Sequence, residues 1–149
     1  MSGPGDNDSG KPGRVWMREI LDKAVLDIEA LGIFADEVVE ARPVWSVPDK
    51  VMIGQLRVAN EPGSFRWIIC GDLPTDHISS TVAANAREAL RHFSLKWQLD
   101  AARYEDPAMR KQHGLDESKD WNRLTRQLVA KAEELYAMAE DDALWQAPG

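Results

Sequence analysis

The chain has 149 residues, a length that suits one domain and lets folding bury well over half of the unfolded surface. Its apolar fraction of 44% and charged fraction of 29% are ordinary for a globular protein. The formal net charge of -7 favours solubility and argues against a generic surface for nucleic acid, whose phosphates it would repel.

Cysteine content and hydropathy bear on the compartment. Cys70 is the only cysteine, so no disulfide can form within the chain and a reducing compartment is expected. No apolar run approaches the roughly 20 residues of a membrane-spanning helix, and the first residues lack the basic start and apolar core of a secretion signal. We expect a cytoplasmic protein that binds no membrane.

The amino-terminal part divides into a tail and a helix. Residues 1–13 are rich in Gly, Pro, Ser and Asp, and we expect them to form a disordered tail. Structure is expected from near Val15. Gly32 is placed to end the first helix because glycine readily adopts the left-handed conformation of a helix cap. Apolar residues with helical spacing form one stripe before it: Ile20, Leu21, Ala24, Val25, Ile28 and Leu31.

Three runs rich in β-branched and aromatic residues follow, at 42–47, 51–59 and 65–70. The segments between them contain proline, glycine, asparagine and aspartate, which are turn-forming residues. Short connections imply antiparallel neighbours, so the pattern predicts a three-stranded meander. Pro43 lacks a backbone donor, which places the first strand at an edge or makes Pro43 its entry point.

Helices are expected in the second half. A long helix is predicted from about Thr81 or Val82 to Tyr104, then a short helical turn that begins at Pro107 and ends at Gly114. Asp116 can cap a last helix that runs to about Asp142. The predicted stripe of the long helix is Val82, Ala86, Ala89, Leu90, Phe93, Trp97, Ala101 and Tyr104, widened by Leu95, Leu99 and Ala102.

The predicted fold class is therefore α+β. An amino-terminal helix is followed by a three-stranded antiparallel meander and then by two long helices with a short helical turn between them. A single domain is expected at 14–143, with residues 144–149 as a loose carboxyl-terminal end.

The loop Gly71–His77 follows a strand and leads towards a helix amino terminus, where backbone donors can hold an anion. Asp72, Asp76 and His77 could also offer metal ligands, but a metal site needs at least three convergent ligands. The loop has one glycine, two acids and no Lys-Ser or Lys-Thr pair, so it is not a phosphate loop. Acid, threonine and proline residues are ordinary loop formers. We therefore predict no metal and no cofactor, and expect the acids to cap the following helix.

Basic residues in the long helix are the only local excess of positive charge near this loop. Arg87 and Arg91 stand one turn apart, and we expect them to pair with acids such as Asp72 and Asp76. His92 is expected at the edge of the core, because no nucleophile or orienting group can be assigned to it. Cys70 ends an apolar strand and is expected to behave as a small apolar residue.

The last helix has an acidic character. Between Asp116 and Asp142 it holds eight acids against four bases, and its far end is acidic although the helix dipole favours positive charge there. This end, flanked by Tyr136 and Trp145, could dock a basic protein. Solvation explains the acids equally well, so both interpretations stay open.

Two runs together resemble a known family. GlyAspLeuProThrAsp at 71–76, after an aromatic strand, and ArgGluAlaLeuArgHisPheSerLeuLysTrpGln at 87–98 are similar to bacterial proteins of the domain-of-unknown-function family numbered 4826. The resemblance covers about Trp16 to Tyr136. It implies a small, acidic, single-domain protein and supplies no activity, cofactor or partner. It marks these positions for probing: Asp72, Thr75, Asp76, Arg87, Arg91, His92 and Trp97.

The favoured hypothesis is a non-catalytic protein-binding domain, such as an adaptor, an inhibitor or an immunity-like protein. It rests on small size, acidity, six tryptophans and the lack of an assembled catalytic set. The expected partner is another protein, a basic one included. One alternative is a small-molecule or anion-binding enzyme-like domain, with a pocket between the 71–77 loop and the Arg87/Arg91 helix face.

A second alternative is a secretion-type chaperone that dimerises through a helix or a strand edge. The sequence leaves open whether the protein is an enzyme and which oligomeric state it adopts. The candidate functional or interaction residues are Asp72, Thr75, Asp76, His77, Arg87, Arg91, His92 and Trp97.

Overall fold

The structure is a computed structural model that describes residues 4–34, 37–61, 63–112, 114–115 and 119–146. The chain forms two compact units, Met1–Ala86 and Arg87–Gly149. Whether they fold together as the single domain expected at 14–143 stays a prediction. No helix in the described part of the chain is long and apolar enough to cross a bilayer.

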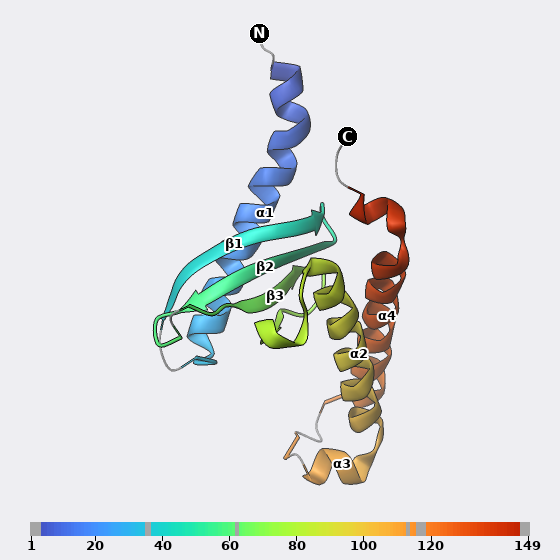
Figure 1. The fold of residues 1–149 in the computed structure, drawn as a ribbon. Coiled ribbons are helices and arrows are strands. Elements are labelled where there is room, and N and C mark those ends of the chain that lie inside the picture. The colour runs from blue at the N-terminus through green and yellow to red at the C-terminus, as the bar shows by residue number, and fades with distance from the viewer. Residues whose placement is uncertain (1–3, 35–36, 62, 113, 116–118, 147–149) are drawn as a thin grey trace. The chain divides into compact units, whose positions relative to one another are not determined.

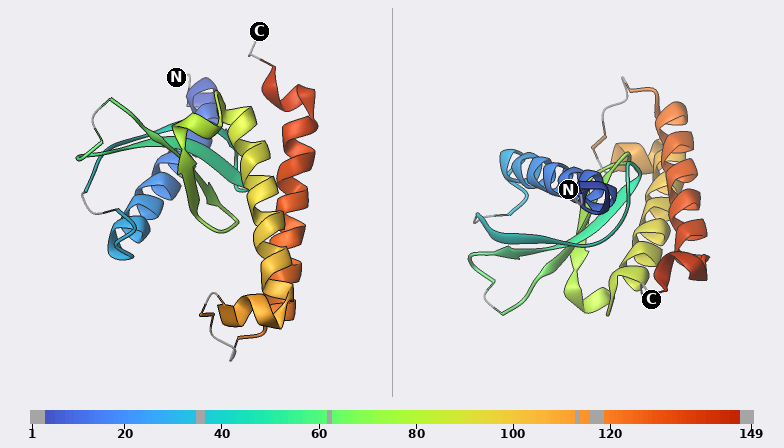
Figure 2. Two further views of the ribbon diagram at one scale, coloured as in Figure 1. Left: turned by 60° about the horizontal axis from the view of Figure 1, so that its bottom comes forward. Right: turned by 90° about the horizontal axis from the view of Figure 1, so that it is seen from above.

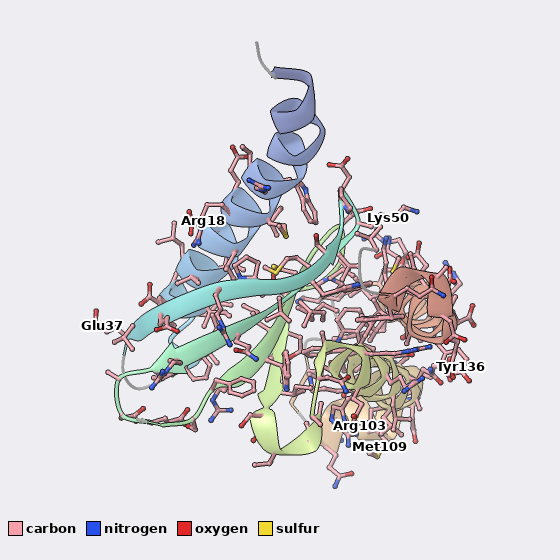
Figure 3. The ribbon with its side chains drawn as sticks, turned by 45° about the horizontal axis from the view of Figure 1, so that its top comes forward. Arg18, Glu37, Lys50, Arg103, Met109 and Tyr136 are labelled. Carbon is pink, nitrogen blue, oxygen red and sulfur yellow. The ribbon has the colours of Figure 1, made fainter. Side chains whose placement is uncertain are left out.

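The first unit is a helix on an antiparallel sheet (Figure 1). It contains α1 (Pro4–Ala30), four strands and a short 3-10 helix, η1 (Ser80–Val82). The strands are β1 (Val38–Val47), β2 (Val51–Val58), β3 (Arg66–Gly71) and β4 (Asp76–Ser79). Each strand pairs antiparallel with the next in the order β1-β2-β3-β4. Figure 3 shows Glu37 and Lys50 near the two ends of β1.

The fourth strand corrects the expected three-stranded meander. β4 pairs Asp76 with Ile69 and Ser79 with Arg66, inside the segment that the sequence assigned to a loop. Only Ile78 of its four residues is buried. A strand this short with one apolar side chain gives no recognisable alternation, so its pairing with β3 could not be read from the sequence.

The first helix begins earlier than expected and ends as expected. It extends from Pro4, where the sequence predicted a disordered tail through residue 13; residues 1–3 lie outside the described part. Glycine and proline in this segment have low helix propensity, so a helix was not expected there. At the other end Gly32 has φ 67, and the Ile33 amide donates to the Ile28 carbonyl at 3.4 Å. This confirms the left-handed cap.

One face of the sheet packs on α1. Leu21, Ala24 and Ile28 of the helix are buried against a row of sheet residues: Met52, Leu56, Ile68 and Cys70. Three members of the predicted stripe are thus confirmed in this core. Leu31 is 75% exposed, so its assignment to the stripe is wrong, because the helix ends at Ala30 and the cap turns the chain away.

The second unit is a helical hairpin. It contains α2 (Ala86–Glu105), α3 (Pro107–Gln112), α4 (Trp121–Glu140) and the 3-10 helix η2 (Asp142–Trp145). Figures 1 and 2 show α2 and α4 side by side along their lengths. The buried Ser94 Oγ donates to the Ala132 carbonyl at 2.7 Å, and the Tyr104 and Trp121 rings lie 5.1 Å apart.

Two helix boundaries differ from the prediction. α2 begins at Ala86 rather than near Thr81, because Ser80–Val82 forms a 3-10 turn and Ala83 returns to an extended backbone. Asp120, not Asp116, caps α4 by accepting from the Arg123 amide at 3.1 Å. Asp116 lies outside the described residues. The start of α3 at Pro107 is as predicted.

Candidate functional site

The 71–77 segment is a connection between two strands of the first unit. The Asp72 amide donates to the Lys50 carbonyl at 2.9 Å, and Asp76 Oδ1 accepts from the His77 amide at 2.8 Å. Thr75 is exposed. The side chain that caps the following 3-10 helix is Ser79, whose Oγ accepts from the Thr81 amide at 3.2 Å. The local hydrogen bonds of this loop hold a strand connection together.

His77 lies on β4 beside an aromatic and a cationic group. Its ring contacts Phe34 edge-on at 5.0 Å, and the Arg66 guanidinium lies 5.1 Å from the centre of the Phe34 ring. Arg66 in turn binds both carboxylate oxygens of Glu61, at 3.2 and 2.9 Å, and this hydrogen bonding lowers the pKa of Glu61. His77 thus belongs to a packed cluster on the sheet.

Arg87 and Arg91 bind the end of α4. Arg87 Nε donates to the Ala139 carbonyl at 2.6 Å and Nη2 to Asp142 Oδ1 at 2.5 Å, while Arg91 Nη2 donates to Glu140 Oε2 at 3.0 Å. The hydrogen bond from Arg87 is the main cause of a lowered Asp142 pKa, and that from Arg91 of a lowered Glu140 pKa. The arginines thus neutralise acids at a helix end where the dipole disfavours them.

The remaining candidates lie on α2 or in the core. His92 is half-buried and Trp97 is 2% exposed, with its ring 6.3 Å from that of Phe93. Cys70 is buried, and burial raises the pKa of its thiol to about 12, so it stays a neutral thiol near neutral pH. Within the described ranges, no three His, Cys, Asp or Glu side chains are grouped to hold a metal. The expected pocket joins residues of the two units and stays a prediction.

None of the six tryptophans is exposed. Trp67 and Trp97 are each 2% exposed, and the other four are half-buried. Two indole nitrogens donate to backbone carbonyls: Trp67 Nε1 to Ala83 at 3.0 Å and Trp145 Nε1 to Met138 at 2.9 Å. The Arg87 guanidinium also lies 5.9 Å from the Trp145 ring centre. The tryptophan side chains therefore contribute to packing within the fold.

An apolar groove lies between α1 and β1 in the first unit. The sequence did not predict it. Its volume is about 380 Å³ and it is lined by Arg18, Asp22, Val25, Leu26, Val38, Val39, Glu40 and Ala41. Leu26 is 66% and Val39 57% exposed. Arg18, labelled on α1 in Figure 3, pairs with Asp22 at 3.5 Å, so these two charges offset each other.

The β1 edge beside this groove is irregular. Two register shifts leave Val39 and Val44 as extra residues opposite β2, and Pro43 lies between them. Bulges and proline are the usual features that stop an edge strand from pairing with another chain. These features disfavour the addition of a strand from another chain at this edge.

A polar pocket of about 350 Å³ lies on the sheet face opposite to α1. Its lining residues are Glu40, Arg42, Gln55, Arg57, Gly63, Ser64 and Phe65. The pairing register sets Arg42 opposite Gln55 and Glu40 opposite Arg57, so these four side chains share one face. Glu40 lines both the groove and this pocket, which makes the two surfaces continuous across β1.

Sequence comparison assigns the chain to a family. The family model described as Domain of unknown function (DUF4826) matches residues 12–145. The chain belongs to this family. No curated protein and no solved structure matches the chain.

The DUF4826 match includes all eight candidate residues and both surfaces of the sheet unit. The two sequence segments on which the resemblance was based, 71–76 and 87–98, form the connection between β3 and β4 and the first part of α2. The groove and the pocket escaped sequence reasoning because they depend on which residue lies in a bulge. The one available signal was Pro43, which indicated an edge strand.

Proposed function

We propose that this DUF4826 protein is a non-catalytic protein-binding domain, as an adaptor or inhibitor would be, and that the α1–β1 groove is its docking surface. The observation that supports this is the gathering of exposed apolar side chains in one groove. Leu26 and Val39, which are each more than half exposed, line it from different elements. Single exposed apolar residues are common, whereas contiguous ones indicate interaction surfaces.

The chemistry of the groove defines the segment that fits it. Val25, Val38 and Ala41 extend the apolar lining, and the paired Arg18 and Asp22 form part of its rim. An apolar side chain of a partner protein placed here would remove Leu26 and Val39 from water, which stabilises a complex in proportion to the area buried. The bulged β1 edge favours a partner that docks by side chains.

A basic partner at the acidic end of α4 is the other form of this proposal. Three acids of this helix end and its flank are engaged within their own unit: Glu140 with Arg91, Asp142 with Arg87 and Glu134 with Lys131. These pairs reduce the charge that the surface offers to a basic protein. The groove is therefore the better-supported docking surface.

Site-specific photo-crosslinking in the native host tests the proposal. A photoreactive residue at Leu26 or Val39 should give one reproducible protein adduct, and the same residue at Arg126, exposed on α4, should not give it. The adduct from Val39 should disappear when Leu26→Asp is added. Adducts that form equally from Arg126, or no adduct from either groove position, would contradict the proposal.

A further inference from the structure

We propose that the pocket on the opposite sheet face binds a carboxylate side chain from an acidic segment of the docked partner, through Arg42 and Arg57. This inference rests on the proposed function, since it names the partner's chemistry at a second surface. Glu40 lines both the groove and the pocket, so a protein that crosses β1 from the groove reaches the pocket directly.

Arg42 is held in position for such a ligand. Its Nε and Nη2 donate to Gln55 Oε1 at 3.0 and 2.7 Å. These two bonds fix the plane of the guanidinium group, and they leave the Nη1 donors without a hydrogen bond to any described residue. A guanidinium group fixed in this way loses less conformational freedom when it binds a carboxylate.

Arg57 supplies the second cation. It is exposed, and its side chain makes no hydrogen bond or ion pair with any residue that the structure describes. Two other arginines of the unit, Arg18 and Arg66, have acid partners at 3.5 and 2.9 Å. Glu40, opposite Arg57 in the pairing of β1 with β2, is the one acid among the residues that line the pocket.

The pocket is cationic even though Glu40 lines it. Arg42 and Arg57 outnumber this single carboxylate, and Gln55 and Ser64 are neutral. A second carboxylate can therefore enter and restore balance, with Nη1 of Arg42 and the guanidinium group of Arg57 able to donate to its oxygens. Phe65 forms an apolar wall, held edge-on to Trp67 with ring centres 5.1 Å apart, against which the methylene groups of a glutamate can pack.

The chemistry favours a protein carboxylate over a free phosphate group. One acid already lies in the pocket, and it would repel a dianion more strongly than a single negative charge. The site is also open to solvent and its arginines are exposed, so a lone ligand binds weakly and gains strength when a partner held in the groove supplies it.

Nuclear magnetic resonance titration of the full chain tests this inference without knowledge of the partner. The probe is glutamate blocked as its N-acetyl N-methylamide, and the matched control ligand is the blocked glutamine. The glutamate probe should shift the Nε–H signals of Arg42 and Arg57 and the side-chain amide signals of Gln55. The glutamine ligand should leave them unchanged at the same ionic strength.

Substitution separates the pocket from general charge effects. Arg57→Gln should weaken binding of the glutamate probe about fivefold or more, whereas Arg126→Gln, an exposed cation on α4, should not. Absence of shifts, equal shifts with the glutamine ligand, or equal weakening by Arg126→Gln would overturn the inference. If inorganic phosphate shifted the same signals and bound more tightly than the glutamate probe, the assignment of the pocket to a carboxylate would be overturned.

The outcomes separate this inference from the proposed function. If the groove gave crosslinks and the glutamate probe did not bind, the carboxylate pocket would be rejected and the docking surface would still be supported. Carboxylate binding without groove crosslinks would keep the pocket and remove the proposed docking surface.

Discussion

The Arg87 side chain donates a hydrogen bond from Nε to the Ala139 carbonyl at 2.6 Å and so closes the end of the α2–α4 hairpin. The last carbonyls of a helix lack partners within the helix, and a cation placed there both binds them and opposes the negative end of the dipole. Arg87 therefore acts as a cap for a helix that starts 34 residues later in the chain.

Replacement of Arg87 by alanine should lower the free energy of unfolding. Loss of the charge-assisted bond to the Ala139 carbonyl accounts for about 1 kcal/mol. Arg126→Ala, which removes an exposed cation from α4 that forms no ion pair with a described residue, is the matched control and should change stability little. Urea unfolding followed by tryptophan fluorescence measures both, and an equal effect of the two substitutions would contradict the capping role.

Acid should weaken the same helix end. The pKa values of Glu140 and Asp142 are lowered from 4.5 and 3.8 by hydrogen bonds from Arg91 and Arg87. Because the folded pKa lies below the unfolded one, the stabilisation is present above these ordinary values and is lost as pH falls through the lowered ones. Tm should therefore fall between about pH 5 and pH 3, and less steeply in the double variant Arg87→Gln/Arg91→Gln. Identical slopes would count against the pairs.

Two buried hydroxyl groups of the hairpin should respond in opposite ways to removal. Ser94 is 1% exposed and donates to the Ala132 carbonyl, whereas Thr125 Oγ1 is buried with no hydrogen bond to a described residue. Ser94→Ala should cost about 1 kcal/mol, while Thr125→Val should leave the free energy of unfolding unchanged or raise it. Chemical denaturation of both variants measures this, and a larger loss at Thr125 would contradict it.

Gly71 should be the less replaceable of two glycines with positive φ. It has φ 130, and an added Cβ would lie 2.6 Å from the Lys50 carbonyl oxygen, a backbone atom that cannot move aside. Gly32 has φ 67 with open space around the Cβ position. Gly71→Ala should cost roughly 2 kcal/mol or more and Gly32→Ala about 1 kcal/mol. Similar losses in a thermal unfolding comparison would refute the close approach.

The fold could be predicted where a pattern is local. The cap at Gly32, the three longer strands and the start of α3 at Pro107 all follow from residues close in sequence. β4 could not be predicted, because its assignment depends on pairing with β3 and not on its own residues. Leu95 and Leu99 were expected to widen the buried stripe of α2, but their side chains are 55% and 54% exposed. The buried face of α2 is therefore narrower than the apolar residues of its sequence indicated.

The ion pairs of Arg87 and Arg91 with the end of α4 could not be predicted from the sequence. The acids that bind Arg87 and Arg91 lie 55 and 49 residues further along, and only the antiparallel return of α4 brings them near. The predicted pairing of these arginines with Asp72 and Asp76 joins residues of the two units and stays a prediction. The groove depends on a bulge that leaves Val39 outward, and a bulge of one residue has no signature in a single sequence.

The most direct test of the docking surface uses the partner protein that crosslinking identifies. This partner is purified, and its affinity is measured for two matched variants of the chain. Leu26 on α1 and Leu99 on α2 are both exposed leucines on helices, but only Leu26 lines the groove. We predict that Leu26→Asp weakens binding at least tenfold, the loss expected for about 1.4 kcal/mol, while Leu99→Asp leaves it unchanged. Loss of binding with Leu99→Asp and not with Leu26→Asp would contradict the assignment of the groove.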